Sequence, residues 1–299
     1  MTNACSQGRS SSPEVTDPLV YIVLLNWNGW RDTARCLESL QQLTYTGYRV
    51  IVVDNGSTDG SVCHIREKYL DVEVIENGEN LGFAAGCNVA IRRALDEGAD
   101  YVWLLNNDTV AHPDSLSTMV DCAQGDPVIG AVGSVIYRMD EPETVDAWGG
   151  GRVSLWTGRS GHITCPKDLP KLDYITGASL LIPRRALESV GLLDERFFLY
   201  YDDCDYGLRL RGAGWKLAVA GPSRIWHKVN ATLGKRREGL DWHIARSGVL
   251  LVRKHAVVPV LAEGLLLCLR LGKRLLERDW QCVRAVLGGA LSARRVQAP

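Results

Sequence analysis

The stretch PLVYIVLLN, residues 18–26, is a continuous run of apolar side chains that ends in an amide. Its β-branched residues and its lack of polar alternation predict a strand buried on both faces, as in a parallel sheet. RVIVVDNGSTDGS (49–61) repeats the pattern, and VEVIE (72–76) and DYVWLLNND (100–108) predict two more strands. Helical patterns separate these four strands, so we predict a Rossmann-like α/β sheet over residues 18 to about 125.

Beyond that sheet the pattern is less regular. The glycine-rich stretch WGGGRVSLWTGRSGH (148–162) is typical of a mobile loop beside a site, further strand and helix patterns follow it, and the C-terminal fifth shows only helical patterns. We therefore expect a disordered lead at 1–17, one domain over 18–238 and a helical, basic extension over 239–299.

The composition limits the classes of partner. The net charge of −1 over 299 residues gives no reason to expect a nucleic acid, although residues 241–299 hold 10 basic and 4 acidic side chains and are therefore basic. The nine cysteines form no CxxC pair, so neither a disulfide framework nor a zinc site is expected. The polar N-terminus MTNACSQGRSSSPEVTDP lacks the apolar core of a signal peptide, and together these features predict a cytoplasmic protein.

Polar and aromatic side chains follow three of the four predicted strands directly. They are Asn26, Trp27, Asp54, Asn106, Asn107 and Asp108. Ligands of open α/β sheets bind at the carboxyl ends of the strands, so we expect the binding site there. The sequence has neither GxGxxG after the first strand nor GxxxxGK[ST], which argues against nicotinamide or flavin enzymes and P-loop hydrolases.

The segment LLNNDTV (104–110) suggests a cation site. A carboxylate and amides at a strand end suit Mg²⁺ or Mn²⁺, which bind through few protein oxygens together with substrate phosphates. Asp54 is placed to take a ribose or a base edge, and both Asp54 and Asp108 have the alternative of capping the next helix. His227, in SRIWHKV, follows another strand pattern and is either a structural imidazole or a further metal ligand.

A run of acids opens a helical pattern in FFLYYDDCDYGLRLRGAGW (197–215). A helix N-terminus favours the ionised form of such acids, and an ionised carboxylate between aromatic side chains suits a general base. The structural alternative is helix capping with an i,i+4 pair between Asp205 and Arg209. That pair explains these two residues but leaves Asp202 and Asp203 unexplained.

Seven motifs, in order and at sensible spacing, resemble those of the inverting nucleotide-sugar glycosyltransferases of family 2, over about residues 19–255. They are VLLNWNG, VVDNGSTDGS, ENLGFAAGCN, WLLNNDT, YITGASLLIPRRALESVGLLDERFF, YYDDCDYGLRLRGAGW and WH. The resemblance implies a GT-A fold, with a nucleotide-sugar-binding half at 18–125 that is merged with a smaller acceptor and catalytic half at 126–238.

The resemblance also assigns roles to single residues. The general base is Asp203, supported by Asp202, Asp205 and Arg209. The ligands of Mg²⁺ or Mn²⁺ are Asp108, its weaker companion Asn106, and His227. The donor-binding residues are Asn26, Trp27, Asp54, Gly82, Asn107, Thr176 and Gly177. Because Asn106 replaces an acid of the family motif, we expect loose metal binding.

The implied reaction is transfer of a sugar from a nucleotide diphosphate to an acceptor hydroxyl in one inverting step. NLGFAAGCN together with NNDT is most similar to bacterial rhamnosyltransferases that use dTDP-L-rhamnose, although Cys87 stands where those branches often carry Asn. YYDDCDY is also similar to galactofuranosyltransferases, so transfer of that or another hexose from a UDP-sugar stays open. A nucleotidyltransferase and a non-catalytic sugar-nucleotide-binding module are the remaining alternatives.

The C-terminal segment AVVPVLAEGLLLCL (256–269) is apolar except for Glu263, and a basic stretch up to residue 284 follows it. The run is too short to span a bilayer. Such a helix either lies on the inner face of an anionic membrane, where a lipid-linked acceptor would be found, or packs on the domain or on a second copy of the chain. Glycans and small molecules are the other acceptor classes that the resemblance allows.

Overall fold

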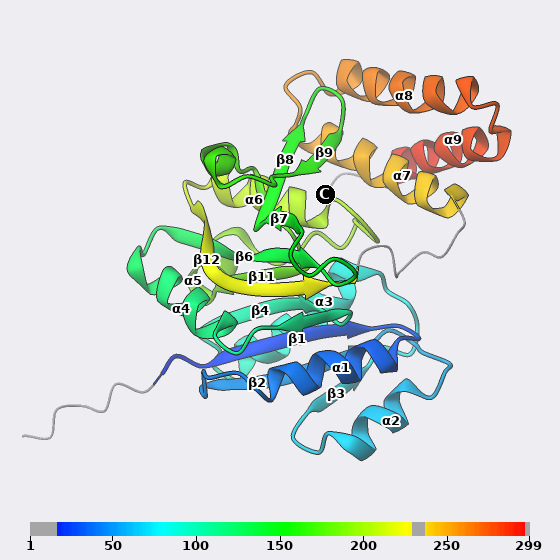
Figure 1. The fold of residues 1–299 in the computed structure, drawn as a ribbon. Helices are drawn as coiled ribbons and strands as arrows, with labels where there is room; N and C mark the ends of the chain where they lie inside the picture. The colour runs from blue at the N-terminus through cyan, green and yellow to red at the C-terminus, as the bar shows by residue number, and fades with distance from the viewer. Residues whose placement is uncertain (1–16, 229–236, 297–299) are drawn as a thin grey trace, which may run out of the picture.

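The computed structural model describes residues 17–228 and 237–296, so the predicted lead, apart from Asp17, lies outside the described residues. Its centre is one large mixed sheet with helices on both faces, and a group of C-terminal helices lies at one end of the molecule (Figure 1). The strands of this sheet follow the order β3-β2-β1-β4-β11-β6-β12-β5, and β7 pairs with β6.

The first half of the sheet is parallel, as the sequence predicts. Its strands are β1 (Val20–Asn26), β2 (Tyr48–Asp54), β3 (Glu73–Glu76) and β4 (Tyr101–Asn106). The helices between them are α1 (Trp30–Leu40), α2 (Ser61–Lys68) and α3 (Phe83–Asp96). Val20, Ile22 and Leu24 of β1 pack in the core on one face, while Tyr21 and Val23 pack in the core on the other. This double burial explains why the strand is apolar without alternation.

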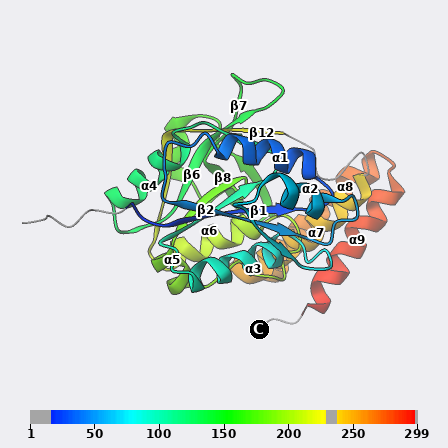
Figure 2. The same cartoon turned by 90° about the horizontal axis from the view of Figure 1, so that it is seen from below.

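The second half joins the same sheet through antiparallel pairing of β11 with β4 and β6. Its strands are β5 (Thr109–Ala111), β6 (Ile129–Arg138), β7 (Val145–Trp148), β11 (Ser179–Pro183) and β12 (Lys216–His227). Helices α1, α2 and α4 (Ser115–Gly125) cover one face, and α3, α5 (Arg184–Val190) and α6 (Asp202–Gly212) cover the other, as the view from below shows (Figure 2).

The stretch 148–162 is not a loop, and the prediction of one is wrong. It forms a hairpin of β8 (Gly150–Ser154) and β9 (Arg159–His162), which pairs with the short β10 (Tyr174–Ile175) as a second sheet; a 3-10 helix (Pro166–Lys171) connects β9 to β10. The glycines serve close packing, because a Cβ at Gly150 would collide with the Tyr174 carbonyl and one at Gly151 with the Gly161 carbonyl.

The C-terminal part is helical, as predicted, and consists of α7 (Arg237–His255), α8 (Pro259–Leu276) and α9 (Trp280–Arg295). These helices share a third core with the segment before α6, in which Val249 and Leu266 pack together with Phe197 and Tyr201. Glu263, the one charge in the apolar run, faces inward and pairs with basic side chains of α7 and α9. None of the helices within 17–228 and 237–296 has the length and apolarity needed to cross a bilayer.

Candidate active site

The ends of β1 and β2 are joined by a buried amide–carboxylate contact. Asn26 is completely buried, and its Nδ2 donates to Asp54 Oδ2 at 2.8 Å while its Oδ1 accepts from Thr33 Oγ1 at 2.8 Å. Asp54 Oδ1 accepts from the Ser57 backbone N–H at 2.8 Å, and α2 begins only at Ser61, so Asp54 does not cap that helix. The amide of Asn26 is therefore occupied in orienting Asp54.

Trp27 follows Asn26 and has a side chain that is 49% exposed. It offers a broad apolar face at the carboxyl edge of the sheet, where an aromatic ring of a ligand would stack. The loops after β1 and β2 are also linked to each other, because the Asn28 N–H donates to Ser57 Oγ at 2.8 Å and the Thr58 N–H donates to Asn28 Oδ1 at 2.8 Å. Trp27 therefore lies in a loop that these hydrogen bonds hold in place.

Gly82 is a close-packing position at the start of α3. It has a φ of +83°, and a Cβ there would lie 2.5 Å from the Phe198 carbonyl oxygen. The next residue, Phe83, donates its backbone N–H to that oxygen at 2.7 Å. Gly82 therefore lets the start of α3 approach the loop that leads into α6.

Asn106, Asp108 and His227 converge at the end of β4. His227 Nε2 lies 3.2 Å from Asp108 Oδ1 and 3.3 Å from Asn106 Nδ2, because the antiparallel pairing of β12 with β5 sets His227 opposite Thr109. The alternative that Asp108 caps a helix is wrong, since a strand follows it. Asn107 points elsewhere and donates to Thr33 Oγ1 at 2.8 Å, so it joins the group that holds Asn26.

This corner offers a carboxylate, an amide and an imidazole, a donor set that fits Mn²⁺ or Mg²⁺ when substrate oxygens complete the shell. The described residues contain no cluster of three His, Cys, Asp or Glu side chains able to hold a metal ion. The corner is therefore a partial site and not a closed protein cage.

Helix α6 begins at Asp202 and carries all three acids in its first turn. Only Asp203 is partly exposed among them, whereas Asp202 and Asp205 are buried. Asp203 accepts from the Gly177 N–H at 3.2 Å and from the Cys204 N–H at 2.7 Å. Asp203 is thus the acid that a ligand can reach.

Burial governs the pKa values of the first two acids. It raises the pKa of Asp203 above the ordinary 3.8, although the backbone N–H groups of Gly177 and Cys204 oppose the shift. Burial and the neighbouring Asp203 charge raise the pKa of Asp202 further. For this pair, desolvation therefore outweighs the stabilisation of the ionised form that a helix N-terminus offers.

The turn between β10 and β11 connects the acid to the cation corner. Gly177 binds Asp203, the neighbouring Ala178 carbonyl accepts from the Asn106 N–H at 3.1 Å, and the Thr176 N–H donates to the Gly149 carbonyl at 2.9 Å. Thr176 and Gly177 therefore lie between the two groups, at the floor of the candidate site.

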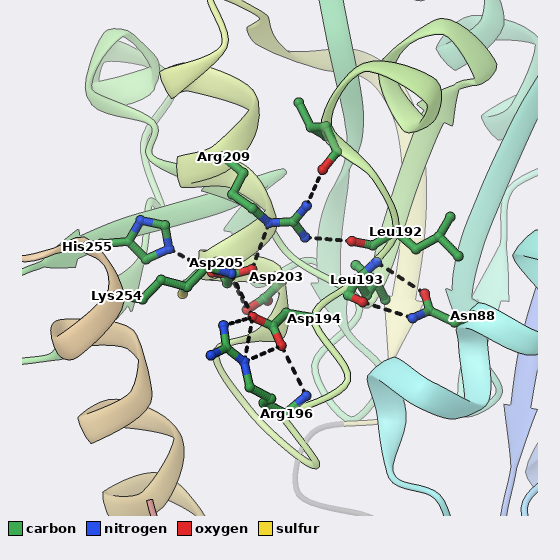
Figure 3. A network of polar contacts seen from close by, with 12 residues as sticks. Asn88, Leu192, Leu193, Asp194, Arg196, Asp203, Asp205, Arg209, Lys254 and His255 are labelled. Atoms are coloured by element: carbon green, nitrogen blue, oxygen red, sulfur yellow. Dashed lines mark hydrogen bonds and ion pairs between the residues drawn. The ribbon is translucent and has the colours of Figure 1, made fainter. Parts of the chain in front are cut away.

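Asp205 has a structural role (Figure 3). Its fully buried carboxylate pairs with Arg209 at 2.9 Å and with Lys254 and His255 of α7 at 2.7 Å each. Burial alone would raise the pKa of Asp205, but hydrogen bonds from His255 and Lys254 and the charge of Arg209 lower it below 3.8. Arg209 also donates to the Val190 and Leu192 carbonyls at 2.7 Å each. The predicted i,i+4 pair is present, and it belongs to a cluster that attaches α7 to α6.

Several supporting residues escaped the sequence analysis. Asn88, inside the quoted ENLGFAAGCN motif, exchanges two hydrogen bonds with Leu193 and so holds the segment before α6. Lys254 and His255 carried no local signal, because their partner is 49 or more residues away. Tyr200 and Tyr201 both have a φ of +65°, a strained conformation, and Tyr201 Oη is held by the Gly158 carbonyl at 2.6 Å.

Comparison with known sequences finds similar proteins over much of the chain. The model of the family described as Glycosyl transferase family 2 matches residues 21–190. The chain is 29% identical over 260 residues to the N-acetylglucosaminyl-diphospho-decaprenol L-rhamnosyltransferase of Mycobacterium tuberculosis. The aligned region covers 79% of this chain and 84% of that protein. The chain is 26% identical over 200 residues to a galactofuranosyltransferase of the same organism, and the aligned region covers 65% of each protein.

Solved structures share the fold. A mannosyltransferase from Pyrobaculum calidifontis, in complex with GDP-Man and Mn²⁺, aligns with a TM-score of 0.59 and 18% identity, over 95% of this chain and 77% of that one. GalNAc-T7 with UDP, GalNAc and Mn²⁺ aligns with a TM-score of 0.63 and 16% identity, over 79% of this chain and 48% of that one. At these identities the likeness shows the GT-A fold and nothing finer.

The buried cluster leads to a prediction about stability. Asp205→Asn should lower the free energy of unfolding by about 3 kcal/mol at neutral pH, because three basic groups lose the charge they surround. A lowered folded-state pKa contributes stability above the unfolded pKa, so the wild-type advantage should vanish as the pH falls through the folded value. Denaturant titration at several pH values measures both effects. The exposed-pair control Asp168→Asn should leave the midpoint unchanged, and an equal loss in both variants would contradict the assignment.

Proposed function

Because the chain belongs to glycosyl transferase family 2 and is a glycosyltransferase, we propose that it transfers an L-rhamnosyl group from dTDP-L-rhamnose to a glycan hydroxyl, with inversion. The observation that supports the proposal most is the partial exposure of the Asp203 carboxylate. Of the three acids at the start of α6 it alone is partly exposed. The turn that binds it also accepts a hydrogen bond from the Asn106 N–H.

The choice of rhamnose rests on the extent of similarity. The match to the rhamnosyltransferase covers 79% of this chain, and the match to the galactofuranosyltransferase covers 65%. Galactofuranosyl or other hexosyl transfer from a UDP-sugar is the second candidate, and NLGFAAGCN with NNDT favours the first. The family membership leaves no reason to retain the nucleotidyltransferase or the non-catalytic module.

On the donor side, we assign the nucleoside to Trp27 and Asp54. The exposed ring of Trp27 would stack on the base, and Asp54, oriented by Asn26, would accept from a ribose or base donor. Asn107 and Gly82 act indirectly, since Asn107 holds Thr33 and Gly82 sets the approach of α3. The diphosphate then points toward the corner of Asp108, Asn106 and His227, which would hold a divalent cation.

On the acceptor side, Asp203 receives the proton of the attacking hydroxyl. The oxygen forms its bond to the anomeric carbon as the bond from that carbon to the diphosphate oxygen breaks, and dTDP leaves with the electron pair. A bound Mg²⁺ or Mn²⁺ supplies neutralisation of the charge that develops on the diphosphate. Thr176 and Gly177 form the floor between the two reacting groups and keep Asp203 oriented through the Gly177 N–H.

The acceptor is proposed to be lipid-linked, and α8 supports this. Along α8, Leu261, Leu265, Leu269 and Leu276 recur at helical spacing and are exposed, so they form an apolar stripe. The neighbouring side of the helix buries Ala262, Glu263 and Leu266 against the rest of the protein, so packing on the domain accounts for only part of the apolar run. Basic side chains such as Lys273 and Arg278 follow, and a stripe with a basic flank suits an anionic membrane surface.

A donor panel tests the proposed reaction. With a short-chain N-acetylglucosaminyl diphosphate lipid as acceptor, mass spectrometry should detect a deoxyhexose adduct from dTDP-L-rhamnose and none from UDP-galactofuranose or GDP-mannose. A product formed only from UDP-galactofuranose would replace the first candidate with the second.

Asp203→Asn should lower kcat by about 10²- to 10⁴-fold, because the acceptor proton loses its base. Nucleotide affinity, measured by isothermal titration, should stay within about twofold, since Asp203 is assigned to the acceptor. A variant that keeps more than about a tenth of the wild-type rate would place the base elsewhere.

The pH profile checks the same residue independently. A base must be ionised, so kcat/KM should fall as the pH falls through the raised pKa of Asp203, with an acid limb above that of an ordinary aspartate at 3.8. The residual activity of Asp203→Asn should lack this limb.

Turnover should require a divalent cation and should fall by about 10- to 100-fold in Asp108→Ala. Because the corner has only one carboxylate, Mn²⁺ should bind weakly alone and more tightly when the nucleotide is present. Calorimetric titration of Mn²⁺ with and without dTDP measures this, and the exposed Asp71→Ala is the control. Full turnover in excess chelator would remove the cation from the proposal.

The protein should float with anionic liposomes at low salt, and replacement of Leu265 and Leu269 by Glu should abolish flotation. The control Leu70→Glu changes a leucine that is 87% exposed outside α8 and should still float. Wild-type protein that stays at the bottom of the gradient and sediments as a dimer would assign the stripe to a second copy of the chain.

A further inference from the structure

An acid–imidazole pair at the edge of the small sheet has no role in the reaction as described so far. His162 ends β9, and its Nδ1 lies 3.1 Å from Asp146 Oδ2 of β7. Asp146 therefore accepts the Nδ1 proton and fixes the orientation of the ring. Nε2 makes no hydrogen bond with any described residue, and the His162 side chain is 38% exposed. The free nitrogen is thus available to a ligand.

The register of the small sheet turns His162 toward the acid helix. His162 lies opposite Gly151, and Gly151 lies opposite Tyr174, so the His162 and Tyr174 side chains share one face. Tyr174 is 3% exposed and packs in the same core as Tyr201 and Cys204, the neighbours of Asp203. Gly151 leaves this row open, because a Cβ there would lie 2.7 Å from Tyr174 Oη.

Electrostatic influences link the pair to the proposed base and to His227 of the cation corner. The charge of His162 is among the influences that lower the pKa of Asp203 against its burial. The hydrogen bond from His162 lowers the pKa of Asp146, and the charge of His227 acts in the same direction. Partial burial would lower the pKa of His162, but the hydrogen bond and the charge of Asp146 raise it above 6.5.

We propose that His162, oriented by Asp146, binds the acceptor sugar through a hydrogen bond between Nε2 and a hydroxyl group next to the one that Asp203 deprotonates. This rests on the proposed transfer reaction and adds a residue that positions its second substrate. Asp203 alone gives a hydroxyl one contact, and a productive attack needs the acceptor held at a second point. Trp27 and Asp54, at the ends of β1 and β2, are assigned to the nucleoside of the donor, so this second point is sought elsewhere.

The test separates acceptor binding from donor binding. In His162→Ala, the KM for the short-chain N-acetylglucosaminyl diphosphate lipid should rise about tenfold, as expected for the loss of a hydrogen bond. The affinity for dTDP by titration, and the slow hydrolysis of the donor by water, should not change. Asp146→Asn should raise the same KM by less, and the double variant should be no worse than His162→Ala, because Asp146 acts through His162.

His112→Ala is the matched control. The His112 side chain is 37% exposed, and its Nδ1 lies 3.8 Å from Asp114 Oδ2. The variant therefore loses a similar acid–imidazole pair outside the site and should keep the wild-type KM. An unchanged acceptor KM in His162→Ala, or an equal loss of dTDP affinity, would overturn the inference while wild-type transfer stands. Absence of transfer by the wild type from every donor would instead overturn the proposed function, and the inference with it.

Discussion

The parallel pairing of β1 with β2 and β4 is the constraint on which the rest of the molecule depends. Parallel strands bring their carboxyl ends to one edge, so Asn26, Asp54 and Asn106 meet although up to 80 residues separate them. The sheet is buried on both faces, which fixes its register, because a slip by one residue would exchange the side chains of the two cores. The strands β1, β2 and β4 end in the polar side chains Asn26, Asp54 and Asn106, and that is where the proposed donor site lies.

The second half of the site depends on contacts over long sequence distances. Helix α6 presents Asp203 because α7 surrounds the neighbouring Asp205 with Lys254 and His255, and because Asn88 of α3 holds the preceding segment (Figure 3). The three acids therefore differ in role because their surroundings differ. Asp205 is neutralised by basic partners, Asp202 is buried beside a like charge, and Asp203 keeps partial exposure and two backbone donors. The C-terminal helices are therefore part of what orients the candidate base.

Chain reversals bring the remaining chemistry together. Strand β12 returns to β5 and delivers His227 to Asp108, while the hairpin of β8 and β9 carries His162 to Asp146. Both histidines contact a carboxylate through one nitrogen. The diphosphate of the donor and the sugar of the acceptor would thus meet separate acid–imidazole pairs.

The sequence by itself determined the parallel half of the sheet, its three helices, the helical C-terminus and the acids at the start of α6, because hydrophobic periodicity and turn chemistry are local. It also determined which strand ends carry polar groups, and its motifs indicated the family. It mistook the glycines of 148–162 for flexibility, because their purpose, room for neighbouring carbonyl groups, lies in other strands. Only the tertiary structure decided which of three adjacent acids is reachable, that Asn26 and Asn107 support their neighbours, and that Asp146 orients His162. Burial and long-range hydrogen bonds decide those roles, and neither is encoded in the spacing of residues along the chain.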